Sequence, residues 1–269
     1  MKRILIFNDV SGLGNCSMAT NLPVFSVLGH YAMPVPTACY SKQTGFNGYR
    51  TLKNDSTSLF SQDILAETAA DAVYVGFCND VQTMCSVKEV AKQQDAFVLV
   101  DPIMGDNGKL YPVFSKQYVE KMKELVPLAN CITPNVTEAC LLADIDYETL
   151  CNGSGGNVVD KCTSAFANFL CKTHCQSAVI TGIDCGDTIA NLVLQNDSCQ
   201  TVVCHKIPVN YSGTGDLFSS VLLGKLLCGS NLIQATTAAA EFVSRSAAIT
   251  ECKDRRFGVE FGKILHELV

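Results

Sequence analysis

Short apolar runs alternate with longer amphipathic segments along most of the chain. A run that is apolar throughout is typical of a strand buried on both faces, and apolar residues spaced three and four apart are typical of a helix. The predicted strands are residues 3–7, 32–37, 72–77, 96–100, 178–181, 189–194 and 201–206. The predicted helices are residues 17–28, 59–69, 81–92, 115–125, 135–142, 158–172, 213–228 and 231–250. This alternation predicts an α/β fold with a mostly parallel central sheet and helices on both faces.

The C-terminal third departs from strand–helix alternation. The runs 189–194 and 201–206 are separated by Asn196 and Asp197, which favour a turn, so we expect an antiparallel hairpin there. The Gly/Ser-rich residues 152–156 predict a loop before a helix, because the composition does not change across them. We therefore expect a single domain over residues 1–269, a length that α/β folds often use.

Charge and hydropathy exclude several classes of protein. Twenty Lys and Arg against 26 Asp and Glu give a net charge of −6, which disfavours nucleic acid as a partner. The first apolar run is interrupted by Asn8 and Asp9, and no stretch approaches the ~20 apolar residues of a membrane span. The sequence therefore predicts a cytoplasmic protein without a membrane partner.

Cysteine is unusually frequent, with 15 residues. In a reducing compartment most of them are expected to be small buried hydrophobic residues. A structural zinc site is the alternative, but no Cys-x-x-Cys pair occurs and Cys171 and Cys175 form the closest pair. The buried interpretation is therefore favoured.

Candidate chemistry is expected where strands end, because α/β sheets bind ligands at the carboxyl ends of their strands. The strongest motif is YSGTGDLF at residues 211–218, in which Gly213, Thr214 and Gly215 open a predicted helix. Free N–H groups at a helix start favour an anion such as a phosphoryl group. Asp216 in the first turn is then either an ordinary acid that suits the helix dipole or a general base.

The segment DPIMGDNGKLY at residues 101–111 follows a predicted strand. Asp101 and Asp106 could hold a cation or position a substrate hydroxyl group. Because Gly105 and the Asn107–Gly108 pair are turn formers, a purely structural loop is the competing interpretation.

The segment ITPNVTEA at residues 132–139 opens a helix. Asn135 and Glu138 have the spacing of a capping box, which is the structural interpretation. The functional interpretation is that they engage hydrated Mg²⁺ and phosphates from one turn of that helix.

Two common nucleotide motifs are absent or incomplete. Gly12 and Gly14 begin a weak dinucleotide fingerprint, but Ser17 occupies the third glycine position, so a nicotinamide site is disfavoured. No Gly-Lys-Ser/Thr tripeptide occurs, so phosphoryl transfer would need a cradle other than a Walker A loop.

Taken in order, these segments resemble the pyridoxal kinase (vitamin B6 kinase) group of the ribokinase-like superfamily, over nearly the whole chain. Residues 213–218 are similar to the anion-hole and base signature of that group, and residues 101–106 with Tyr111 are similar to its second signature. Residues 126–142 resemble a third signature. The pairs Gly14-Asn15 and Thr44-Gly45 resemble its substrate-pocket segments.

The resemblance implies a pyridoxal kinase-type phosphotransferase that uses ATP and Mg²⁺, with a monovalent cation as a further possibility. Its acceptor would be the 5'-hydroxymethyl group of pyridoxal, pyridoxine or pyridoxamine. Asp216 would accept the hydroxyl proton while Gly213, Thr214 and Gly215 donate N–H groups to the γ-phosphoryl group. The resemblance assigns the nucleotide to Asp101, Asp106, Tyr111, Asn135, Thr181 and Gly182, and Mg²⁺ to Glu138 and Asp101.

On the acceptor side the resemblance assigns substrate contacts to Asn8, Asp9, Tyr40, Ser41, Thr44 and Phe77. Many members of the group have Ser where this chain has Asn8 and Asp9, and some have Asn and His at Lys42 and Gln43, so the acceptor is less certain than the phosphoryl chemistry. A hydroxymethylpyrimidine or small-sugar kinase is the first alternative, although hydroxymethylpyrimidine kinases usually carry Cys in place of Asp216. A non-catalytic vitamer-binding protein is the second. The resemblance also implies a homodimer.

Overall fold

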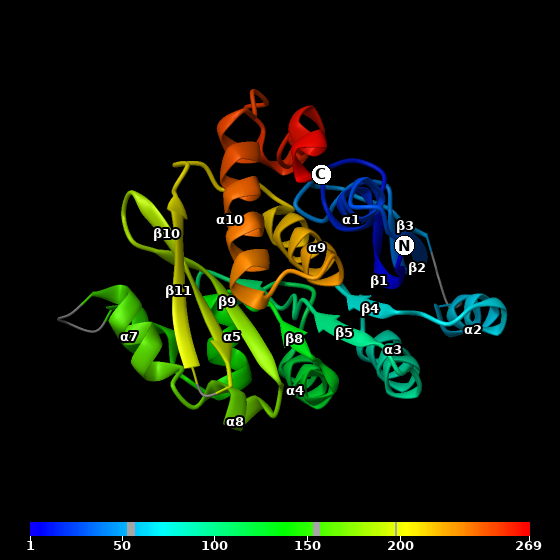
Figure 1. Cartoon of the computed structure of the whole chain (residues 1–269), viewed down its shortest axis with the longest axis horizontal. Coiled ribbons are helices and arrows are strands. Elements are labelled where there is room, and N and C mark those ends of the chain that lie inside the picture. Colours follow the sequence, from blue (N-terminus) through cyan, green and yellow to red (C-terminus); the bar gives the residue numbers. More distant parts are fainter. Residues whose placement is uncertain (53–56, 153–156, 197) are drawn as a thin grey trace.

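The computed structural model describes residues 1–52, 57–152, 157–196 and 198–269. Within them, nine strands form one sheet in the order β11-β10-β9-β8-β5-β4-β1-β2-β3 (Figure 1). The strands are β1 (Arg3–Ser11), β2 (Tyr31–Tyr40), β3 (Thr51–Leu52), β4 (Ala72–Val75), β5 (Phe97–Val100), β8 (Cys131–Ile132), β9 (Ser177–Asp184), β10 (Thr188–Gln195) and β11 (Ser198–His205). A separate small hairpin pairs β6 (Gly105–Asp106) with β7 (Lys109–Leu110).

The pairing pattern confirms a mostly parallel sheet with an antiparallel extension. Strands β2, β1, β4, β5, β8 and β9 are parallel neighbours, whereas β10 runs antiparallel to both β9 and β11. The expected hairpin is confirmed, because Gln195 pairs with Ser198 at its tip. Strand β8 was not predicted, since two buried residues are too few to produce a periodic signal.

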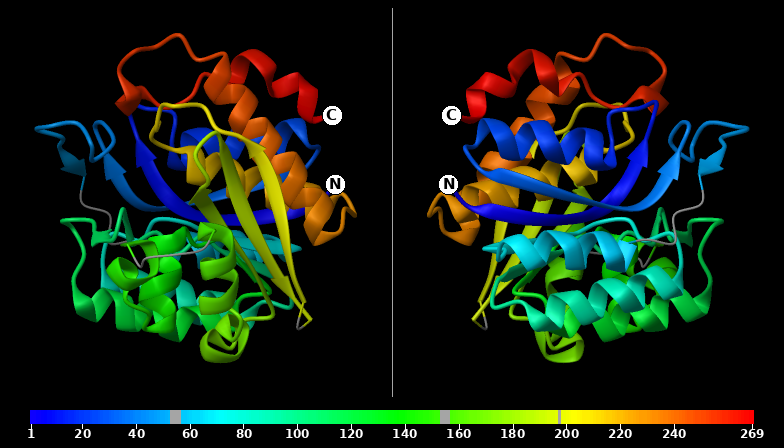
Figure 2. Two further views of the ribbon diagram at one scale, coloured as in Figure 1. Left: turned by 90° about the vertical axis from the view of Figure 1, so that its left-hand side faces the viewer. Right: turned by 90° about the vertical axis from the view of Figure 1, so that its right-hand side faces the viewer.

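Two helical layers enclose the sheet (Figure 2). The first layer contains α1 (Ser17–Val27), α9 (Thr214–Leu227), α10 (Leu232–Ala248) and the 3₁₀ segment η3 (Phe261–Leu268). The second contains α2 (Thr57–Glu67), α3 (Val81–Gln93), α4 (Lys116–Leu125), α5 (Val136–Ala143), α6 (Tyr147–Asn152), α7 (Val158–Ala165) and α8 (Phe169–Thr173). Two further 3₁₀ turns are η1 (Val126–Leu128) and η2 (Arg255–Phe257).

Burial on both faces explains why the central strands are apolar throughout. In β1, Ile4 and Ile6 pack into the core under α1 and α9, and the alternate residues Leu5 and Phe7 pack into the core under α3 and α4. Side chains alternate between the faces of a strand, so a strand covered twice needs apolar residues at consecutive positions.

One helix prediction was wrong. The pattern over residues 158–172 predicted one helix, but the chain forms α7 and α8 with an irregular turn between them. The rings of Phe166 and Phe169 are both buried and meet edge to face with centroids 5.7 Å apart. Packing of this aromatic pair, with Asn168 at the start of α8, decides the break. Of the predicted loop at residues 152–156, Asn152 instead ends α6, and residues 153–156 lie outside the described residues.

Among the described residues, no helix combines the length and hydropathy that crossing a bilayer requires.

Candidate active site

The candidate residues lie along one edge of the sheet because parallel strands end there together. Asn8 and Asp9 lie near the end of β1, Phe77 follows β4, Asp101 follows β5 and Thr133 follows β8. Helix α9 begins at the same edge, as shown by the hydrogen bond that joins Asn8 to the first turn of α9. The structure therefore brings the phosphoryl-transfer candidates and part of the acceptor-side candidates to one place.

The start of α9 is fixed by Gly213. Its backbone has a φ of 76°, which favours glycine, and a Cβ there would collide with the carbonyl oxygen of Asn15 and with Cys16. The first N–H groups of a helix have no acceptor within the helix. Gly213 thus lets α9 begin against the start of α1, and Thr214 and Gly215 supply the first N–H groups of the helix.

Asp216 is in the first turn of α9 and is only 7% exposed. Its Oδ1 accepts a hydrogen bond from Asn8 Nδ2 at 3.0 Å, and its Oδ2 accepts one from the Ser17 N–H at 2.9 Å. Burial raises the pKa of Asp216 to about 6, although these two hydrogen bonds act in the opposite direction. A carboxylate with a pKa in that range is ionised at neutral pH and is a stronger base than an exposed aspartate.

Asp101 is the second buried carboxylate at this edge. Its Oδ1 accepts a hydrogen bond from Thr133 Oγ1 at 3.2 Å, while Thr133 Oγ1 lies 2.9 Å from Ser219 Oγ on α9. Its Oδ2 is buried without a hydrogen-bond partner among the described residues, and a Cβ built on Gly215 would lie 3.9 Å from that oxygen. Burial, and to a lesser extent the charge of Asp216, raises the pKa of Asp101 to about 7. This oxygen therefore lies close to the start of α9.

Asn135 and Glu138 form the capping box that their spacing predicted. The Asn135 side chain accepts a hydrogen bond from the Glu138 N–H, and Glu138 Oε2 accepts one from the Asn135 N–H at 2.9 Å. Glu138 Oε1 also accepts from the Met104 N–H at 3.0 Å, which ties α5 to the segment after β5. Burial raises the pKa of Glu138 well above its ordinary value. The structural interpretation is confirmed, and a role toward Mg²⁺ stays a prediction.

The segment after β5 forms the β6–β7 hairpin. Asn107 and Gly108 have φ values of 52° and 75° at its turn, the conformation that an Asn-Gly pair favours. Asp106 is exposed and accepts hydrogen bonds from the backbone and side chain of Asn107. Tyr111 is 39% exposed. The structural interpretation of these turn residues is confirmed, and contacts of Asp106 and Tyr111 with a nucleotide stay predictions.

Thr181 and Gly182 lie on β9 beside the start of α5. The Thr181 N–H donates to Pro134 O at 2.8 Å, and Thr181 forms an isolated parallel bridge with Asn135. Gly182 has a φ of 75° and no atom within 4 Å of a built Cβ, so its surface is open. The structure thus places this pair next to Asn135, and contacts of Thr181 and Gly182 with a nucleotide stay predictions.

On the acceptor side, Tyr40 and Phe77 meet edge to face with ring centroids 6.1 Å apart. Asp9 is buried and accepts a hydrogen bond from Ser11 Oγ at 2.8 Å. Ser41 and Thr44 are exposed, and the hydroxyl of Ser41 accepts a hydrogen bond from the Arg50 N–H at 2.8 Å. The two rings supply an apolar surface, while the hydroxyl groups lie in a loop outside the buried network.

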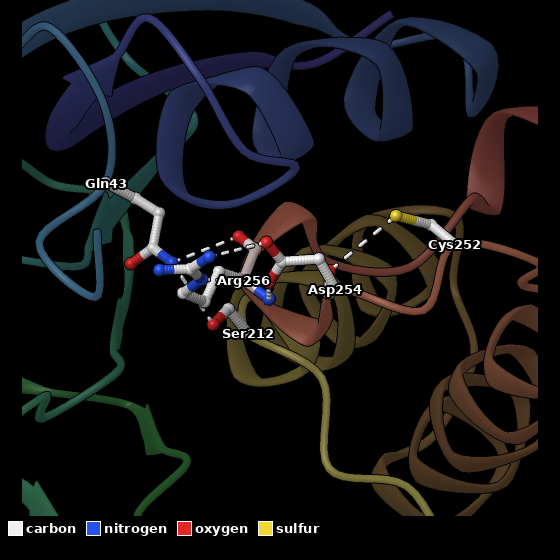
Figure 3. Close-up of polar contacts among 5 residues, drawn as sticks. All are labelled: Gln43, Ser212, Cys252, Asp254 and Arg256. Carbon is white, nitrogen blue, oxygen red and sulfur yellow. Dashed lines mark hydrogen bonds and ion pairs between the residues drawn. The ribbon is translucent and has the colours of Figure 1, made fainter. Parts of the chain in front are cut away.

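Gln43 has a structural role that the amino-acid sequence did not predict (Figure 3). Its Nε2 donates to Arg256 O at 3.0 Å and lies 3.4 Å from Ser212 Oγ, while its Oε1 accepts from the Gly45 N–H at 2.8 Å. The Arg256 guanidinium lies 4.6 Å from the centre of the Phe46 ring and pairs with Asp254. These contacts join the loop after β2 to the turn η2 and to the segment before α9.

A cavity of about 470 Å³ lies between the segment before α9 and the segment after α10. The basic side chains on its wall belong to Lys253 and Arg255. Its lining residues are Pro208, Val209, Tyr211, Thr250, Glu251, Cys252, Lys253 and Arg255. The sequence did not predict this cavity, since only Tyr211 among its lining residues belongs to a recognised motif.

Sequence analysis also missed the polar residues that support the two carboxylates. Asn21 and Ser220 belong to the network around Asp216, and Thr133 and Ser219 contact or neighbour Asp101. All four are buried. For Asn21, Ser219 and Ser220 the available signal was a polar residue within a mostly apolar helix, because buried polar groups normally have specific partners.

Comparison with known proteins agrees with this architecture. The model of the phosphomethylpyrimidine kinase family matches residues 14–262. A pyridoxal kinase from Arabidopsis thaliana is 29% identical over 217 residues, which cover 74% of this chain and 65% of the plant protein. The match thus spans slightly less than two thirds of that relative.

Kinases named for another acceptor, hydroxymethylpyrimidine, have a similar degree of sequence identity to this chain. A hydroxymethylpyrimidine/phosphomethylpyrimidine kinase from Staphylococcus aureus (strain MSSA476) is 24% identical over 246 residues, which cover 88% of this chain and 84% of that protein. The crystal structure of a putative phosphomethylpyrimidine kinase from Bacteroides thetaiotaomicron with pyridoxal is 29% identical and has a TM-score of 0.88; the match covers 99% of this chain and 95% of that one. Because the family model matches nearly the whole chain, the chain belongs to the phosphomethylpyrimidine kinase family, and its similarity to pyridoxal kinases confirms the resemblance stated above.

Proposed function

We propose that this protein transfers the γ-phosphoryl group of ATP to the 5'-hydroxymethyl group of a vitamin B6 vitamer, giving the 5'-phosphate and ADP. The observation that carries this proposal is the position of Asp216. Its buried carboxylate lies in the first turn of α9, next to the free N–H groups of that helix. A base and an anion-binding helix start are thus adjacent, as in-line phosphoryl transfer requires.

The proposed roles follow from this geometry. Asp216 accepts the proton of the acceptor hydroxyl, and the oxygen of that hydroxyl attacks the γ-phosphorus. The N–H groups of Gly213, Thr214 and Gly215 stabilise the negative charge on the phosphoryl oxygens. The cavity lined by Tyr211 and Arg255 takes the base and ribose of ATP, because it opens beside the segment that leads into α9.

A divalent cation fits the site only together with phosphate oxygens. No three Asp, Glu, His or Cys side chains among the described residues could hold a metal ion by themselves. Asp101 offers one unpartnered buried oxygen, and Mg²⁺ commonly binds one or two carboxylates together with substrate phosphates and water. Asp101 would hold the ion directly, with Glu138 and Asn135 acting through water. When bound, Mg²⁺ neutralises charge on the phosphates.

The acceptor side of the proposal rests on two aromatic rings. A vitamer ring would lie against Tyr40 and Phe77, with Thr44 near its substituents. Hydroxymethylpyrimidine is the second candidate, because the pyrimidine kinases of Staphylococcus aureus are similar to this chain over most of its length. Asp216 favours the vitamer, because hydroxymethylpyrimidine kinases usually carry Cys at this position.

A direct test is an acceptor panel with ATP and Mg²⁺. Wild-type protein should form phosphate esters of pyridoxal, pyridoxine or pyridoxamine faster than that of hydroxymethylpyrimidine. Asp216→Asn should lower kcat by about 10²–10⁴-fold, the usual contribution of a general base, while the affinity for ATP changes little. Asp184→Asn, an exposed Asp on β9, is a matched control that should keep the wild-type rate.

Three outcomes would contradict the proposal. Unchanged turnover in Asp216→Asn would reject the base assignment. Faster esterification of hydroxymethylpyrimidine would reassign the acceptor. Tight pyridoxal binding without ATP turnover would show a vitamer-binding protein.

A further inference from the structure

Asn8 was expected to contact the substrate, but its side chain points into the protein. It is fully buried, and its amide group makes four hydrogen bonds. Oδ1 accepts from the N–H groups of Phe77 at 2.9 Å and Asp9 at 3.0 Å. Two backbone donors at one atom define it as the oxygen, so Nδ2 is the donor on the opposite side.

Both protons of Asn8 Nδ2 have acceptors. One goes to Asp216 Oδ1 at 3.0 Å and the other to Asn21 Oδ1 at 2.8 Å. Asn21 Nδ2 then donates to Ser220 Oγ at 2.8 Å, and Ser220 Oγ donates to the backbone carbonyl of Asp216 at 2.6 Å. The network therefore runs from β1 through α1 to α9 and returns to Asp216.

The backbone also accommodates this arrangement. A Cβ at Gly76 would lie 2.7 Å from Asn8 Nδ2 and 2.9 Å from Oδ1, so the absence of a side chain at Gly76 leaves the space that the amide of Asn8 occupies. An amide with all its hydrogen-bonding positions filled by protein groups has none left for a ligand.

We propose that Asn8 is a positioning residue for Asp216. It holds the carboxylate in the orientation that accepts the acceptor's proton, and it does not contact the acceptor. This inference rests on the proposed function. Loss of the Asn8 amide should change the orientation and the pKa of Asp216, because the donor to Asp216 Oδ1 is removed. Acceptor binding should stay nearly intact, because the contacts of the acceptor ring with Tyr40 and Phe77 are kept.

Other titratable groups also surround Asp216. Two are carboxyl groups, of Asp9 on β1 and of Asp101 after β5. Three are neutral at pH 7, namely the Cys16 thiol and the phenol groups of Tyr74 and Tyr111. Burial raises the pKa of all three neutral groups, so they do not titrate between pH 5 and 9. Asp101 takes its hydrogen bond from Thr133, which a change at Asn8 leaves in place.

The experiment compares the pH profiles of kcat/KM for wild type and Asn8→Ala with the best acceptor of the panel. Because a hydrogen bond to the carboxylate stabilises its charged form, its loss should move the acidic limb upward by about 1–2 pH units. At pH 7, kcat should fall about 10- to 100-fold, since part of the contribution of the base is lost. The KM for the acceptor should change less than about threefold, within the variation of uniform binding.

The isosteric Asn8→Asp variant tests the same point if Asn8→Ala does not fold. It replaces the donor with a second carboxyl group about 3 Å from Asp216 Oδ1, so the acidic limb should move further than in Asn8→Ala. Asn130→Ala is a matched control at the opposite end of the sheet. Asn130 accepts a hydrogen bond from the Val98 N–H before β8, so its loss should leave the pH profile unchanged.

The outcomes separate the inference from the function on which it rests. Wild-type protein without turnover for any acceptor would reject the proposed function. An active wild type whose Asn8→Ala variant shows a higher acceptor KM and an unmoved acidic limb would overturn the inference and return Asn8 to the substrate-binding residues. A lower melting temperature with unchanged limb and kcat would also overturn it.

Discussion

At the scale of single residues, two buried carboxylates dominate the site. Asp216 has a hydrogen bond to each oxygen, whereas one oxygen of Asp101 has no partner among the described residues. Burial raises the pKa of both carboxyl groups, to about 6 for Asp216 and about 7 for Asp101. A raised pKa means that ionisation costs the folded state more than the unfolded state, so these groups reduce stability at high pH.

Replacing Asp101 by Asn should therefore change how stability depends on pH. The stability associated with wild-type Asp101 is fully present below about pH 4 and is lost as pH rises through about 7. The melting temperature of the variant minus that of wild type should therefore become more positive from pH 5 to pH 8. A change of 1 kcal/mol corresponds to about 2–4 °C in a chain of this size. Thermal scans at several pH values measure it.

Asp146→Asn is the control for that series. Hydrogen bonds from Thr149 lower the pKa of this exposed carboxyl group, so Asp146 stays ionised over the whole interval. Its melting-temperature difference should be flat from pH 5 to pH 8. An equally flat melting-temperature difference for Asp101→Asn would show that burial does not raise the pKa of Asp101.

At the scale of elements, the first turn of α9 depends on a backbone conformation as well as on a sequence motif. Gly213 has a left-handed conformation and lies against Asn15 and Cys16 at the start of α1. This packing lets α9 and α1 meet where the Ser17 N–H reaches Asp216. Helix α9, which carries Asp216, is thus positioned by the backbone of Gly213, a residue without a side chain.

Gly213→Ala should destabilise the protein by more than the penalty of a positive φ alone. Gly186→Ala is the matched control, because Gly186 has a φ of 86° but no atom within 4 Å of a built Cβ. The control should lose about 1–2 kcal/mol, the cost of a left-handed residue. Gly213→Ala should lose more and also lower kcat, since the N–H groups of α9 move. Equal losses in denaturant titrations would contradict this explanation.

At the scale of the whole molecule, the cysteines are distributed through the fold without gathering at the reacting groups. Cys85, Cys171, Cys199 and Cys228 are exposed, whereas Cys16 and Cys78 near the acceptor side are buried. Burial raises the pKa of the Cys78 thiol to about 12, and burial followed by the charge of Asp216 raises that of Cys16 further. A thiol is reactive as its thiolate, so Cys16 and Cys78 are expected to react more slowly than the exposed cysteines.

Treatment of the native protein with a maleimide at pH 7 should therefore label the exposed cysteines first, without loss of turnover. Mass spectrometry of peptides from the labelled protein, with an activity assay of the same sample, checks this. Replacing those exposed residues by serine is the control, which should retain activity and slow the labelling. Early labelling of Cys16 together with inactivation would show that the site opens more than the structure indicates.

The sequence by itself determined the fold class and indicated where a phosphoryl group could bind. Hydrophobic periodicity is local, so apolar runs and helical spacing located most strands and helices, and the capping box of Asn135 and Glu138 depends on four consecutive residues. Glycines at 213 and 215 with Asp216 identified a helix start suited to an anion, for the same local reason.

Only the tertiary structure decided which polar groups surround Asp216. Asn8 and Asp216 are 208 residues apart, and Asn21 and Ser220 are 199 apart, so no local pattern couples them. Nor could the sequence separate a buried Asn from one that faces a ligand, because burial depends on the elements that pack around it. The two-residue strand β8 has the same origin, since it is defined by its pairing with the distant strands β5 and β9.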